Sequence, residues 1–115
     1  MATPEQADQS SPERRKFIRH QVAIPIEMLP EGASVAGRTQ TSEVSLGGCY
    51  VEMIQTMQVG TKLHLGLWVK DEKITTDAEV VTHHPGFGNG MKFLNMSSGD
   101  EGHLKRFLES LPKDE

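Results

Sequence analysis

The stretch KLHLGLWVKDEKITTDAEVVTH, residues 62–83, indicates the class of fold. Apolar side chains occupy every second position from Leu63 to Val69, which is the two-residue period of a strand with one buried face. The polar run Lys70–Lys73 interrupts this pattern, and Ile74–His83 supplies a second segment rich in β-branched residues. The stretch therefore predicts an antiparallel hairpin with a polar tip.

Short β segments separated by turn residues continue on both sides of this hairpin. Four further strands are expected over Val22–Leu29, Arg38–Ser45, Cys49–Ile54 and Met91–Leu94. Pro25 favours an edge position for the first of these, because proline has no N–H to give to a neighbouring strand. Six strands at short spacing predict an all-β protein, a small six-stranded antiparallel β-barrel, since closure removes exposed sheet edges.

The C-terminal segment changes to the period of a helix. Its apolar residues fall three or four positions apart and form one stripe: Leu104, Phe107, Leu108 and Leu111. Ser98 and Glu101 have the spacing of a capping box, and Pro112 marks the end. We expect a helix over about residues 98–111 that covers the barrel or a partner.

The length of 115 residues suits one domain and excludes a large enzyme with separate cofactor and substrate halves. Residues 1–12 are expected to be a disordered N-terminal tail, and residues 13–20 form an arginine-rich segment that acts as a flexible arm. The barrel and its helix take up residues 21–112, and residues 113–115 form a short tail. The chain shows neither a signal peptide nor an apolar run long enough to span a membrane, so we expect a cytoplasmic protein.

The single cysteine, Cys49, cannot form an intramolecular disulfide or supply a cysteine-rich zinc site, so no metal or cofactor is expected. The formal net charge of −4 argues against a general binder of DNA or RNA, which relies on many Lys and Arg contacts to phosphate. Four positive charges nevertheless gather at Arg14, Arg15, Lys16 and Arg19. This local cluster is suited to binding a small anion.

Two short motifs carry the candidate chemistry. Arg15 and Arg19 stand four residues apart just before the first strand, and a guanidinium can donate two parallel hydrogen bonds to a phosphate or to the edge of guanine. The loop Glu43-Val44-Ser45-Leu46-Gly47-Gly48 offers a carboxylate acceptor for guanine, a hydroxyl, and glycines that let backbone N–H groups approach an anion. Taken singly, a solvated linker and an ordinary hairpin turn remain alternatives for the two motifs.

Together, in this order and ahead of a β-rich chain, the motifs resemble those of the PilZ family, bacterial receptors for the second messenger cyclic di-GMP. The signature of that family is R-x-x-x-R followed by [D/N]-x-S-x-x-G. Arg15 and Arg19 match the first motif, Ser45 and Gly48 match the second, and Glu43 departs from it. Gly88-Asn89-Gly90-Met91-Lys92-Phe93 is similar to the glycine-rich turn before the last barrel strand of the family. The resemblance spans about residues 14–111.

The resemblance implies a split-barrel fold with a C-terminal helix and a cyclic dinucleotide bound where the arginine segment folds over the loop. The ligand-binding residues that it implies are Arg14, Arg15, Arg19, Glu43, Ser45, Gly47 and Gly48. The arginines are expected to contact phosphate and guanine, Glu43 to accept from guanine, and Ser45 and the glycines to support the loop. No residue is expected to be catalytic.

The expected function is that of a non-enzymatic receptor that passes its signal in trans, to an unidentified effector protein or through self-association as a homodimer. The alternative in the same fold is an adaptor that has lost cyclic di-GMP binding, since Glu43 stands where the family has Asp or Asn. A small hydrolase built on His83 or His84 ranks lower, because no nucleophile, base and orienting residue form a recognisable group. Adjacent strand residues also point to opposite faces, which keeps these two histidines from converging on one metal ion.

Overall fold

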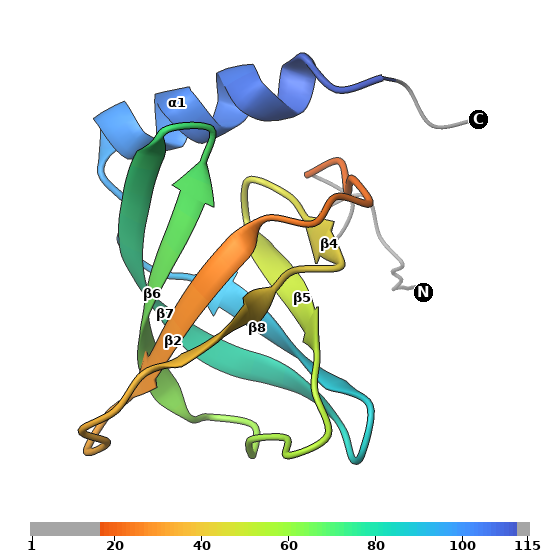
Figure 1. Cartoon of the computed structure of the whole chain (residues 1–115), viewed down its shortest axis with the longest axis vertical. Coiled ribbons are helices and arrows are strands. Elements are labelled where there is room, and N and C mark those ends of the chain that lie inside the picture. Colours follow the sequence, from red (N-terminus) through yellow and green to blue (C-terminus); the bar gives the residue numbers. More distant parts are fainter. Residues whose placement is uncertain (1–16, 113–115) are drawn as a thin grey trace, which may run out of the picture.

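The computed structural model describes residues 17–112 and contains one curled antiparallel sheet with a single helix (Figure 1). The strands are β2 (Pro25–Pro30), β3 (Gly37–Gln40), β4 (Glu43–Val44), β5 (Gly48–Glu52), β6 (Lys62–Val69), β7 (Glu72–His84) and β8 (Gly88–Phe93), and the helix is α1 (Ser98–Glu109). The order across the sheet is β3-β2-β6-β7-β8-β5-β4. The predicted all-β barrel with a C-terminal helix is confirmed, with seven strands in place of six.

The β6–β7 hairpin forms where the alternating pattern predicts it. The apolar residues of β6 are buried from Leu63 to Val69, and Leu67 pairs with Ile74 across the hairpin. The tip is shorter than expected: Val69 already pairs with Glu72, so only Lys70 and Asp71 form the turn. Lys70 adopts a left-handed backbone with φ of 59°, the sign that tight hairpin turns require.

The strand expected over residues 38–45 is divided in two, which accounts for the seventh strand. β3 ends at Gln40 and β4 starts at Glu43, and these two strands form opposite edges of the sheet. Thr41 leaves the ladder because its hydroxyl donates to the Val22 carbonyl at 2.8 Å and accepts from the Ile24 N–H at 2.9 Å. The chain therefore passes from one sheet edge to the other within two residues, and this crossing curls the sheet.

The prediction that the strand containing Pro25 lies at a sheet edge is wrong, because β2 lies between β3 and β6. Pro25 is tolerated there as the first residue of the strand, where it faces Gln40 of β3 and the pairing with β6 begins only at Ile26. The strand starts three residues later than predicted, although Ile24 before it is already buried.

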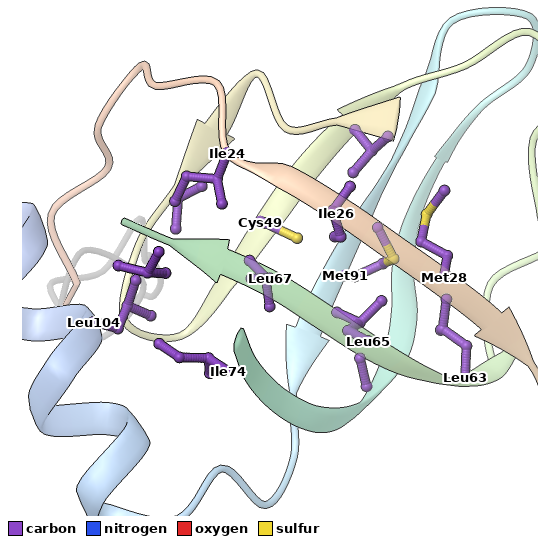
Figure 2. Close-up of a cluster of buried hydrophobic side chains, with 14 of the residues drawn as sticks. Ile24, Ile26, Met28, Cys49, Leu63, Leu65, Leu67, Ile74, Met91 and Leu104 are labelled. Atoms are coloured by element: carbon purple, nitrogen blue, oxygen red, sulfur yellow. The ribbon is translucent and has the colours of Figure 1, made fainter. Parts of the chain in front are cut away.

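The core fills the inside of the curled sheet and is closed at one end by α1 (Figures 1 and 2). Leu104 and Leu108 of the predicted apolar stripe are buried, and Figure 2 shows Leu104 beside Ile74. The cap differs from prediction by one residue: the side chain of Ser97, and not of Ser98, accepts the N–H of Asp100 at 3.1 Å. Ser97 has the extended backbone of an N-cap, so Ser98 is already helical.

Candidate ligand-binding site

The turn at residues 45–48 is built by the side chain of Ser45. Its hydroxyl accepts the N–H groups of Gly47 at 3.1 Å and Gly48 at 3.2 Å, and its backbone N–H donates to the Gly48 carbonyl at 2.8 Å. Both hydroxyl lone pairs are therefore used inside the turn. The Ser45 side chain therefore fixes the shape of this turn.

Two glycines in this turn are needed because neighbouring groups approach them closely. A Cβ at Gly48 would lie 2.1 Å from the carbonyl oxygen of Met91, which is closer than any real contact. A Cβ at Gly47 would lie 2.6 Å from Cδ2 of Phe17, so the Phe17 ring packs directly over Gly47. The two glycines thus let β5 approach β8 and let the segment before β2 rest on the loop.

Arg19 and Glu43 meet beside this turn. His20 forms an isolated bridge with Val44, in which each backbone N–H donates to the other residue's carbonyl at 2.9 Å. This bridge holds Arg19 next to β4, with its Nη1 3.9 Å from Oε1 of Glu43. The Arg19 side chain is 71% exposed, so the pair is weak and open to a ligand. Arg14 and Arg15 lie outside the described residues.

A groove of about 450 Å³ opens on the outer face of the sheet at this point. Its lining comes from the segment before β2, the turn, and strands β4, β5, β7 and β8: Arg19, Glu43, Val44, Ser45, Gly48, Cys49, Tyr50, Val81, Thr82, His84, Gly90 and Met91. The structure thus brings together four of the predicted site residues, Arg19, Glu43, Ser45 and Gly48. It places Gly47 next to them, under Phe17.

Sequence reasoning did not identify Tyr50, Thr82 and His84 as part of this groove. Tyr50 Oη lies 2.8 Å from Nδ1 of His84, and the two rings have centroids 5.8 Å apart. Such residues can be assigned to the groove only when the strand register is known. Tyr50, for example, pairs with Glu43 on one side and with Gly90 on the other. The adjacent His83 contacts a different partner, Thr56, so the two histidines do not act together.

Cys49 is buried as a packing residue, and burial raises the pKa of its thiol to about 12. The thiolate needed for nucleophilic chemistry is therefore disfavoured at neutral pH. Within residues 17–112, no group of three His, Cys, Asp or Glu side chains is arranged to hold a metal ion.

A second groove of about 440 Å³ lies over β2, β6 and β7. Its polar group consists of His64, Asp77 and Asn95, and hydrogen bonds from Asn95 and His64 lower the pKa of the Asp77 carboxyl. Glu27 and Lys73 also line it and form an ion pair at 3.6 Å. These side chains satisfy one another, and within residues 17–112 neither Arg19 nor the glycine turn lines this groove.

Comparison with known proteins gives one family and several similar folds. The model of the PilZ domain family matches residues 13–110. No curated protein matches the chain. Within the described part of the chain, no helix combines the length and apolar character that crossing a membrane requires.

Three solved structures share the fold. The PilZ domain of YcgR from Escherichia coli, solved with cyclic di-GMP, is 18% identical with a TM-score of 0.69, over 85% of this chain and 91% of that one. The Bacillus subtilis inhibitor of motility MotI/DgrA is 19% identical with a TM-score of 0.68, over 85% of this chain. This chain covers 53% of MotI/DgrA, about half its length. The PilZ domain of CeSA from a cellulose-synthesizing bacterium is 19% identical with a TM-score of 0.61, over 79% of this chain and 94% of that one.

Proposed function

This chain belongs to the PilZ domain family, and from that premise we propose that it is a receptor that binds cyclic di-GMP and passes the signal to a partner without catalysis. The groove beside Arg19 is the proposed binding site. The domain of Escherichia coli YcgR that has this fold was solved with cyclic di-GMP, which supports the choice of ligand.

The observation that carries the proposal is the meeting of Arg19 and Glu43 over a backbone turn that opens into a groove. Cyclic di-GMP has two phosphodiesters and two guanines, so it needs cations, an acceptor for guanine N–H groups, and a surface without bulky side chains. Arg14, Arg15 and Arg19 would supply the cations, and Glu43 the acceptor. Ser45, Gly47 and Gly48 would act by holding the turn in shape.

Signalling is proposed to follow from ordering of the arginine segment. Binding of the dianion would neutralise the cationic residues 14–19 and hold them over the groove, changing the surface that the domain presents. The partner would be an effector protein in trans or a second copy of the chain.

Calorimetric titration with cyclic di-GMP tests the proposal. We expect saturable binding by wild type, and a loss on the order of 1–3 kcal/mol for each of Arg15→Ala and Arg19→Ala, by analogy with bidentate guanine contacts. Arg38→Ala is the matched control, because Arg38 is an exposed arginine that pairs with Glu27 on β2, away from the groove. If the binding heat does not saturate at high micromolar cyclic di-GMP, the proposed receptor function is wrong.

That negative result would favour the adaptor that works through protein contacts alone. One feature of the site favours this second candidate: Glu43 stands in place of the family's Asp or Asn, and its carboxylate faces Arg19. Chromatography of the ligand after incubation distinguishes a receptor from a hydrolase, since a receptor returns cyclic di-GMP intact and a hydrolase yields the linear dinucleotide.

A further inference from the structure

Tyr50 lies in the middle of the outer face that forms the groove. It pairs with Glu43 of β4 on one side and with Gly90 of β8 on the other, and Gly90 in turn pairs with Thr82 of β7. Residues paired across strands share one face of a sheet, with Cβ atoms roughly 5 Å apart. The side chains of Tyr50 and Glu43 therefore leave the sheet from neighbouring positions on the same face, and both line the groove.

The glycines of β8 leave room for the Tyr50 ring to lie across that strand. A Cβ at Gly88 would stand 2.8 Å from Cε2 and 2.9 Å from Oη of Tyr50, and a Cβ at Gly90 would stand 3.6 Å from Cδ1. A side chain at position 88 would push the ring away. The ring thus spans both glycine positions of β8.

His84 fixes the ring in this position. Its Nδ1 lies 2.8 Å from Oη of Tyr50, at the end of the ring away from the β5 backbone. The two rings are tilted by 47° and do not stack on each other. A tyrosine held at both ends needs little further ordering when a ligand arrives, which reduces the entropic cost of binding.

We propose that Tyr50 is a platform on which one purine base of the ligand stacks, with the edge of that base directed toward Glu43. The inference rests on the proposed function and assigns a base-binding role to Tyr50 and a positioning role to His84. Stacking on an aromatic ring accepts any base, so Tyr50 would add affinity while Glu43 selects guanine. Among the groove residues, the rings of Tyr50 and His84 are the aromatic ones.

Calorimetry on Tyr50 variants tests whether the ring face is what binds. We expect Tyr50→Leu to weaken cyclic di-GMP binding by on the order of tenfold to a hundredfold, the effect of losing one base–aromatic stack. Tyr50→Phe keeps the ring and loses only the contact to His84, so its affinity should fall by less than about threefold. Equal losses in the two variants would overturn the proposal, because the hydroxyl would then carry the contact.

The matched control is Trp68→Leu. Trp68 is an aromatic residue of β6 that lies outside the groove, beside the side chains of Arg38 and Lys73. Its replacement should leave affinity unchanged. Thermal unfolding of each variant checks that the barrel remains intact, and if Tyr50→Leu does not fold, the ring signal of the wild-type protein provides the test.

A spectroscopic measurement separates stacking from a purely structural role. The chain contains a single tyrosine, so fluorotyrosine labelling gives one ring signal without assignment. We expect this signal to move on titration and to saturate at the affinity that calorimetry gives. If wild type binds cyclic di-GMP in an Arg19-dependent manner but the Tyr50 signal does not move, the proposed stacking on Tyr50 is wrong and the receptor function stands. If wild type does not bind at all, both proposals fall.

Discussion

At the scale of single residues, the geometry of the candidate site depends on the position of the Glu43 carboxylate. Glu43 lies on β4 with its Oε1 3.9 Å from Nη1 of Arg19, and its side chain is 35% exposed. Compared with the Asp or Asn of the family motif, Glu43 has one additional methylene. A hydrogen bond from guanine to this carboxylate would depend steeply on distance and angle, so the extra length would displace the acceptor from the position that the motif provides.

We predict that Glu43→Asp tightens the binding of cyclic di-GMP by up to about tenfold, roughly the value of one better-formed hydrogen bond. The shorter side chain also draws the carboxylate back from Arg19, which frees the guanidinium for phosphate. Calorimetry of the variant beside wild type measures the change, with Glu27→Asp as a control because Glu27 pairs with Arg38 and Lys73 outside the groove. Unchanged or weaker affinity would mean that the turn is adapted to glutamate.

At the scale of elements, the sequence pattern predicts strands better than it predicts their partners. The alternation from Leu63 to Val69 depends only on one buried face, and β6 forms as expected. Residues 38–45 also read as one strand, yet Thr41 bonds to Val22 and Ile24 and the chain changes sheet edge there. Contacts between residues distant in the sequence decide which edge of the sheet a strand joins. The periodicity of the local sequence carries no information about these contacts.

The same limit explains which site residues were found. Arg19, Glu43 and Ser45 belong to short motifs that are contiguous in the sequence, and the structure brings them together. Tyr50 reaches the groove through its register with Glu43 and Gly90, and His84 through pairing with Gly88. Such cross-strand neighbours can be named only once the pairing is known.

The start of α1 offers a test of an element boundary. Ser97→Ala removes the acceptor for the Asp100 N–H, and we expect the free energy of unfolding to fall by about 1 kcal/mol. Ser98→Ala is the matched control and should change it by no more than a few tenths of that value, because Ser98 is already inside the helix. Urea denaturation of the two variants measures the difference. A larger loss for Ser98→Ala would place the cap one residue later.

At the scale of the whole molecule, charge is unevenly distributed along the chain. Residues 14–19 carry four positive charges, and because the total is −4, the remainder carries −8. Glu43, the acidic member of the groove, already faces Arg19. A small dianion that enters the groove would meet the cations of the arginine segment, while the remainder of the chain carries the net negative charge.

This separation of charge leads to a prediction about the segment as a unit. Saturating cyclic di-GMP should slow tryptic cleavage after Arg15 and Arg19 by at least about tenfold, if binding holds both guanidiniums against the ligand and lowers the population that a protease can cut. Guanosine monophosphate at the same concentration is the control, since it lacks the second base and the cyclic diester. Cleavage after Arg38 on β3 provides an internal reference, because Arg38 pairs with Glu27 away from the groove. If both bonds are cut at the same rate with and without ligand while calorimetry shows saturation, the ligand binds without ordering the segment, and the signal must leave through the barrel surface instead.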